Sequence, residues 1–184
     1  MEMQKIIDLY EQRKEEKEKN IRSFFIDKTQ PFLLMQSPPG NIWGRCNTIE
    51  EIYSNNIKYF EECLLNEHTD TLPYLEPWIG VGIYANAFGC EYMWRDDNAP
   101  DTHYKYHKID EIKNIAYPDW KKAPLMKMVV DCINNFNDKT GGKLPIVLTD
   151  TQSPFDTATL LLETTEFFTA CYTDAEAIQE FMQK

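Results

Sequence analysis

The stretch that decides the fold is LPIVLTDTQSPFD, residues 144–156. Its apolar run ends abruptly in polar residues at Thr149, and Ser153 and Pro154 then suit the N-cap and first position of a helix. This order predicts a buried strand, a polar loop and a helix N-terminus, which is where α/β proteins build their sites. We therefore expect an α/β fold with functional residues in the loop.

Two similar strand–helix units precede this stretch. The first begins with the apolar segment 31–35, which predicts a strand buried on both faces, followed by a rigid loop over residues 36–40. The residues Thr48 to Glu51 form a T-x-x-E capping box for the helix behind it. The second unit has a strand at 71–75 and a short helical or irregular segment at 80–89. Three parallel strand–helix units are therefore expected.

The remaining segments frame these units. Residues 2–27 predict a leading helix with a solvated, charged middle, so the expected division is 1–27 and 28–184. Asp119 is expected to cap an amphipathic helix that ends at Gly141-Gly142. The segment 173–176 is a second capping-box sequence, which predicts a last helix reaching Met182.

Composition narrows the function classes. A net charge of -11 over 184 residues repels phosphate backbones and anionic membranes, so we expect no nucleic-acid partner and no membrane partner. No apolar run is long enough to span a bilayer, and the charged N-terminus lacks the core of a secretory signal. A cytoplasmic protein with a small-molecule substrate is the expectation.

A metal site within this chain is not expected. The five cysteines are widely spaced, odd in number and free of C-x-x-C pairs, which favours reduced, mostly buried thiols. His103 and His107 have the i, i+4 spacing of a helical metal site, but the intervening Tyr104 and Tyr106 alternate as in an extended strand. The prediction is therefore no metal ligand.

The carboxyl ends of parallel strands share one face, so the loops after the three strands should meet there. The candidate residues in these loops are Gln36, Ser37, Glu76, Trp78, Asp150, Gln152 and Ser153.

Each candidate has a functional and a structural interpretation. The carboxylates Glu76 and Asp150 suit general acid–base work, because close carboxylates raise one another's pKa, but loop acids also bond their own backbone or a surface base. Gln152 and Ser153 can donate to a substrate carboxylate, whereas Ser153 can equally serve as a helix cap. Trp78 can form a wall for a flat ligand or pack under a loop.

Three stretches together resemble the uroporphyrinogen decarboxylase superfamily, which includes corrinoid-dependent methyltransferases. They are residues 31–37, residues 70–90 with their Ala-Phe-Gly-Cys end, and residues 150–158. The resemblance covers roughly residues 20–184 and implies a TIM barrel with its site at the C-terminal mouth. A complete barrel needs ~250 residues, so the chain resembles the N-terminal half.

The resemblance also implies the chemistry. Decarboxylases of the family bind substrate carboxylates with arginines in the first loop, whereas Met35-Gln36-Ser37 is followed by no arginine at the matching positions. A substrate other than uroporphyrinogen, small and carboxylated or methylated, is therefore implied. Glu76 falls near the family's essential aspartate, and Leu160 near its expected tyrosine. The methyltransferase branch uses zinc and a corrinoid protein partner, with zinc ligands in the second half of its barrel, outside residues 1–184.

Three hypotheses stay open. The chain is a family enzyme or its first half, with no cofactor of its own. Alternatively it is an inactive half-barrel that binds a ligand or forms a homodimer to cover its open sheet edges. A third alternative is a doubly wound domain whose loops match the family by chance.

Overall fold

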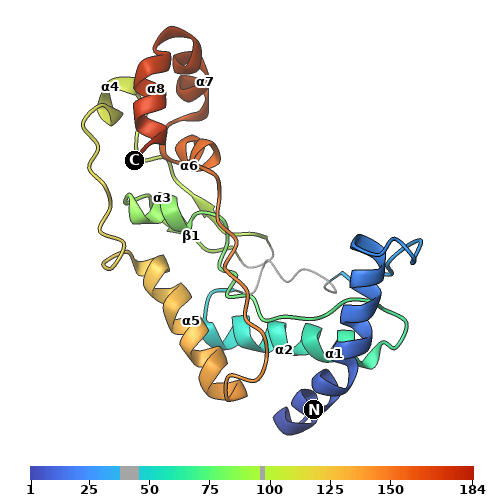
Figure 1. The fold of residues 1–184 in the computed structure, drawn as a ribbon. Coiled ribbons are helices and arrows are strands. Elements are labelled where there is room, and N and C mark those ends of the chain that lie inside the picture. Colours follow the sequence, from blue (N-terminus) through green and yellow to red (C-terminus); the bar gives the residue numbers. More distant parts are fainter. Residues whose placement is uncertain (38–45, 96–97) are drawn as a thin grey trace. The chain divides into compact units, whose positions relative to one another are not determined.

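The computed structural model describes residues 1–37, 46–95 and 98–184. The expected loop at 36–40 therefore lies partly outside the described residues. The chain divides into two compact units: unit 1 comprises Met1–Pro77 and Cys132–Leu148, and unit 2 comprises Trp78–Asp131 and Thr149–Lys184. The described residues are mostly helical, with one small sheet, as Figure 1 shows. The expected division at residue 27 stays a prediction.

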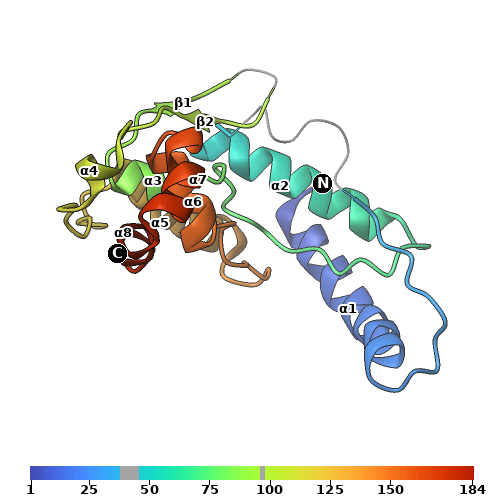
Figure 2. The same ribbon diagram turned by 90° about the horizontal axis from the view of Figure 1, so that it is seen from above.

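Unit 1 is built on the helices α1 (Met3–Phe25) and α2 (Ile49–Leu65), which pack against each other (Figure 2). Both helices were predicted, and the capping box is confirmed: Thr48 Oγ1 accepts from the Glu51 amide at 3.2 Å, and Glu51 Oε2 accepts from the Thr48 amide at 3.1 Å. The rings of Tyr10 and Phe60 lie 5.4 Å apart in the core.

A buried lysine fastens α1 to the second strand segment. Lys17 is only 5% exposed, and its Nζ donates to the Thr69 carbonyl at 2.6 Å. Burial lowers the pKa of Lys17, because removing the ammonium group from water disfavours its charged form. The charged middle of α1, predicted to be fully solvated, therefore has one side chain turned into the core.

The strand segments of unit 1 are much shorter than predicted. Residues 71–75 and 144–148 meet in one parallel bridge between Leu75 and Ile146. The prediction of a buried strand at 31–35 is wrong, because no strand forms there and the side chains of Phe32, Leu34 and Met35 are exposed. Within the described residues, the long-range hydrogen bonds of this segment all go to residues 69–71, whereas a strand buried on both faces needs a neighbour on each side.

Unit 2 contains short elements around a separate core. In chain order they are α3 (Ile83–Ala87), β1 (Tyr92–Met93), β2 (Asp101–Thr102), α4 (Ile109–Ile112), α6 (Pro154–Leu161), α7 (Thr164–Thr173) and α8 (Ala175–Met182). The strands β1 and β2 pair antiparallel within the segment 91–107 that was expected to be a long excursion. Helices α6, α7 and α8 contact one another (Figure 1). Leu161, Phe167 and Ile178 are buried in the core of this unit.

Two helix starts differ from the prediction. The helix α5 (Pro124–Thr140) begins five residues after Asp119, whose carboxylate instead accepts from the Lys121 amide at 3.3 Å in a tight turn. The last helix is capped by Asp174, not by Thr173, because Thr173 still belongs to α7 and bonds the Thr169 carbonyl.

Other boundaries are confirmed. Gly141 and Gly142 end α5 with φ angles of 61° and 68°, a conformation that glycine adopts without steric cost. Ser153 caps α6, with Pro154 in its first turn. None of the helices that the structure describes has the length and apolar character needed to cross a bilayer.

Candidate functional site

A pocket of about 660 Å³ lies within unit 2. Its wall is mostly aromatic and aliphatic, with amide and hydroxyl groups at a few points. The lining residues are Tyr84, Ala87, Phe88, Pro118, Trp120, Met126, Thr151, Gln152, Pro154, Thr157, Ala158, Leu161, Phe181, Met182, Gln183 and Lys184. Among the residues that the structure describes, no Asp, Glu or Arg lines it, although the chain carries 30 acidic residues. Such a cavity suits a small ligand with an apolar body and few polar substituents.

The α3 wall of the pocket is rigid. Asn86 lies in α3, where its Nδ2 donates to the Cys90 carbonyl at 3.0 Å and its Oδ1 accepts from the Leu125 amide at 3.4 Å, at the start of α5. Gly89 ends the helix with a φ of 95°. Burial raises the pKa of the Cys90 thiol to about 11, so this thiol is a packing group and no nucleophile at neutral pH. Tyr84 and Phe88 are therefore presented from a fixed support.

The predicted residues in the loop before α6 differ in their positions and contacts. Gln152 and its neighbour Thr151 line the pocket, whereas Asp150 is exposed and does not. Ser153 Oγ accepts from the Asp156 amide at 3.3 Å and lies 2.7 Å from Asp156 Oδ2, which makes it a helix cap. A substrate contact by Ser153 or Asp150 stays a prediction.

The predicted residues of the first two loops lie in unit 1. Asn56 of α2 holds the backbone of Glu76 at two points: its Oδ1 accepts from the Glu76 amide at 2.7 Å and its Nδ2 donates to the Glu76 carbonyl at 2.9 Å. Gln36 is similarly fixed, because its Oε1 accepts from Asn66 at 3.0 Å and its carbonyl from the Tyr59 hydroxyl at 2.7 Å. Ser37 is exposed.

The seven candidate residues are thus divided between the units. Gln36, Ser37 and Glu76 belong to unit 1, and Trp78, Asp150, Gln152 and Ser153 belong to unit 2, where Trp78 is nearly buried. A common mouth formed by all seven stays a prediction. Sequence reasoning missed most of the pocket. The i, i+4 spacing of Tyr84 and Phe88 was a signal that the sequence offered. The positions of Trp120 and Met182 in the pocket wall depend on tertiary packing, which the sequence does not show directly.

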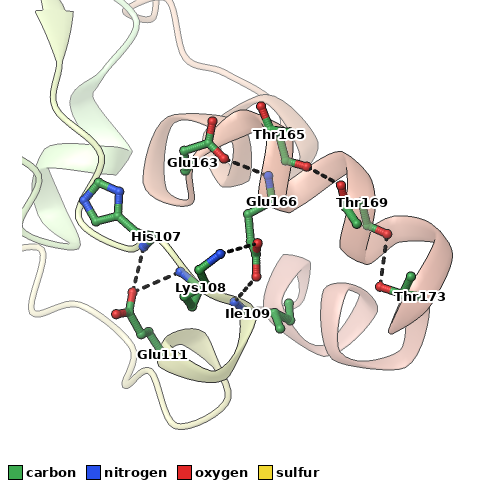
Figure 3. A network of polar contacts seen from close by, with 9 residues as sticks. All are labelled: His107, Lys108, Ile109, Glu111, Glu163, Thr165, Glu166, Thr169 and Thr173. Carbon is green, nitrogen blue, oxygen red and sulfur yellow. Dashed lines mark hydrogen bonds and ion pairs between the residues drawn. The ribbon is translucent and has the colours of Figure 1, made fainter.

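A second polar cluster joins α4 to α7 (Figure 3). Glu166 Oε1 accepts from the Ile109 amide at 3.1 Å, and its Oε2 pairs with Lys108 Nζ at 3.1 Å. The Ile109 amide and then Lys108 lower the pKa of Glu166. Glu111 lies at the same helix start, where its Oε2 accepts from the amides of His107 at 2.7 Å and Lys108 at 3.2 Å. Both carboxylates bind main-chain N–H groups at or just before the start of α4, so the cluster anchors this helix.

Nowhere in ranges 1–37, 46–95 and 98–184 do three or more His, Cys, Asp or Glu side chains gather in a way that could hold a metal ion. Cys46, Cys63, Cys90 and Cys132 are buried. The described residues therefore do not fit a zinc site of the kind that the resemblance implies for methyltransferases.

Comparisons with known proteins agree on the fold. The family model for uroporphyrinogen decarboxylase (URO-D) matches residues 79–184, more than half of the chain. A solved methyltransferase from Methanosarcina mazei superposes with a TM-score of 0.64 at 16% sequence identity, over 85% of this chain and 48% of that one. The chain thus spans about half the length of this relative. No curated protein sequence matches.

Proposed function

Because the chain belongs to the uroporphyrinogen decarboxylase family, we propose that it forms the substrate-binding N-terminal part of a partial TIM-barrel protein. Its substrate is small and carboxylated or methylated. The observation that carries this proposal is that every residue lining the pocket, from Tyr84 to Lys184, falls inside the segment that matches the family model. The pocket and the family resemblance therefore point to the same part of the chain.

The pocket wall supports a substrate other than uroporphyrinogen. A ligand with many carboxylates needs several cations, and the described part of the lining offers one lysine and no arginine. The aromatic groups of Tyr84 and Trp120 suit apolar contact, while Gln152 can donate and accept hydrogen bonds. These groups fit a ligand with one or two polar substituents.

The assignment of Glu76 and Asp150 to catalysis is a separate proposal, taken from their places after the predicted strands, because neither residue lines the pocket. The two-point hold of Asn56 on Glu76 supports a positioning role, because a fixed backbone narrows the directions that the carboxylate can take. If alanine at both positions left turnover unchanged in the active protein, the assignment of Glu76 and Asp150 would be wrong.

Methyl transfer is the second candidate, favoured by the fold likeness to a methyltransferase. It requires a corrinoid partner, and zinc ligands from outside this chain. Transfer of a methyl group to cob(I)alamin changes its visible spectrum, so this reaction is separable from decarboxylation, which releases CO₂. A half-barrel that binds its ligand without catalysis is the remaining alternative, and it predicts binding with neither product.

The test uses the fluorescence of Trp120 in the pocket wall. Small mono- and dicarboxylates, methylated thiols and methylated amines are titrated separately, and Trp120→Phe identifies the part of the signal that comes from the pocket. We expect Gln152→Ala to weaken binding by roughly 2- to 10-fold, the effect of one lost hydrogen bond. Gln179→Ala is the matched control, because Gln179 is exposed and lies outside the pocket. Equal affinities of the two variants would place the ligand elsewhere.

A further inference from the structure

One wall of the pocket in unit 2 comes from a segment without regular structure. Residues 113–123 connect α4 to α5 and form neither helix nor strand (Figure 1). We call residues 116–122 of this segment the strap. Two strap residues, Pro118 and Trp120, line the pocket. The position of the strap therefore determines how closed the pocket is on this side.

Both ends of the strap are fixed to the body of unit 2. Before the strap, Ile115 packs against the core of this unit, and its carbonyl accepts from Lys184 Nζ at 3.0 Å. After the strap, Ala123 is buried, and the Leu125 amide donates to Asn86 Oδ1 at 3.4 Å. Hinges of moving segments are commonly a few residues at the ends of elements, which is where these contacts lie.

Between these ends the strap is weakly attached. Among the described residues, the one hydrogen bond that ties it to a distant part of unit 2 runs from the Tyr117 hydroxyl to the Gln183 carbonyl, at 3.3 Å, just after α8. We call this bond the latch. The remaining hydrogen bonds of the strap are local, such as those from the amides of Lys121 and Lys122 to Asp119, at 3.3 and 2.9 Å. The strap is therefore ordered within itself and held at its middle by the latch.

Trp120 gives the strap a reason to close. This residue lines the pocket, yet it is 55% exposed. Apolar surface that stays in water gains free energy when a ligand covers it, and an aromatic ring provides a large area for such contact. The latch opposes opening only slightly, because a hydroxyl and a carbonyl that separate can each bond to water. Ligand binding and latch opening therefore act on the strap in opposite directions.

We propose that the strap is a lid, which swings about Ile115 and Ala123 when the latch between Tyr117 and Gln183 breaks, and which closes on a bound ligand through Trp120. Segments with few attachments open at a low cost in free energy, and the lids of binding sites are drawn from such segments. The inference rests on the proposed function, because a lid has a role only over a pocket that takes a ligand.

The test follows Trp120 by fluorine NMR, first without ligand, in protein labelled with fluorotryptophan. Trp120→Phe assigns its signal, and relaxation dispersion measures exchange between the closed and the open strap. Tyr117→Phe removes the donor of the latch and should raise the open population roughly 2- to 10-fold, the effect of one lost hydrogen bond. The matched control is Tyr172→Phe, which removes a hydroxyl from a 93% exposed residue of α7 outside the pocket and should leave the exchange unchanged.

Benzoate, an apolar ring with one carboxylate, is the ligand probe, and at saturation it should suppress the exchange of Trp120. A Trp120 signal whose shift and exchange are the same in Tyr117→Phe and Tyr172→Phe would overturn the inference, as would benzoate that binds without reducing the exchange. Circular dichroism checks that the variants keep their helices. A different result bears on the proposed function: if no ligand binds while the exchange still responds to Tyr117→Phe, the motion of the strap stands and the proposed function is wrong.

Discussion

At the scale of single residues, side-chain amides stabilise the structure by forming hydrogen bonds with main-chain groups. Asn56 illustrates this, because one side chain satisfies both the amide and the carbonyl of Glu76 and also donates to the Ile52 carbonyl at 2.9 Å. The i−4 bond to Ile52 is local, whereas the bonds to Glu76 bridge 20 positions. Nothing in the sequence around Asn56 indicates the second partner.

We predict that Asn56→Ala lowers the free energy of unfolding by about 1–3 kcal/mol, since partly buried peptide groups lose hydrogen bonds. Urea denaturation monitored by circular dichroism measures the change. Asn134→Ala is the matched control, because Asn134 is exposed on a helix and alanine there should be neutral or slightly stabilising. Similar losses in both variants would mean that the hold on Glu76 contributes nothing to stability.

At the scale of elements, α4 is a four-residue helix that depends on carboxylates from two places in the chain. Glu166 binds the Ile109 amide from α7, and Glu111 binds the amides of His107 and Lys108 (Figure 3). The pKa values of Glu166 and Glu111 are both lowered by these backbone donors. A lowered pKa means that the folded state favours the ionised carboxylate. The stabilisation is therefore complete above the unfolded-state pKa, near 4.5, and is lost as the pH falls through the folded-state value.

The amide of Ile109 should report this titration. We predict that its NMR chemical shift moves with an apparent pKa below 4.5, and that Glu166→Gln removes the part of the shift caused by Glu166 while leaving the helix in place at neutral pH. Glu180→Gln, at an exposed position of α8, is the control and should keep the wild-type titration. An Ile109 shift that titrates identically in the Glu166→Gln variant would contradict the assignment.

The elements also show where sequence reasoning succeeds. The boundaries at Thr48, Ser153 and Gly141 were predictable, because caps and glycine stops act through residues a few positions away. The burial of segment 31–35 was not, since apolar side chains indicate a preference and not the presence of a covering neighbour. The break between α6 and α7 was also missed. It depends on Leu162 bridging to Tyr106, far away in the sequence.

At the scale of the whole molecule, charge opposes compactness. The chain has 30 acidic and 19 basic residues, so its cations compensate only part of the negative charge and leave a net charge of -11. Most ion pairs in the described part of the chain join two solvent-exposed side chains, as in Lys127–Asp131 and Lys122–Asp119. Exposed pairs of this kind each contribute about 0–1 kcal/mol to stability. Long-range repulsion should therefore outweigh what these pairs provide.

The salt concentration distinguishes long-range repulsion from the attraction within ion pairs, because the electrostatic screening length falls from about 30 Å at ~10 mM salt to about 10 Å at ~100 mM. Repulsion between distant carboxylates is screened first, whereas contact pairs lose little. We predict that the thermal midpoint rises between ~10 and ~150 mM NaCl and then levels off. Replacing the exposed Glu2 and Glu180 by lysine raises the net charge by four and should flatten the response. A midpoint that falls with salt would mean that ion pairs, and not net repulsion, dominate the electrostatics of the fold.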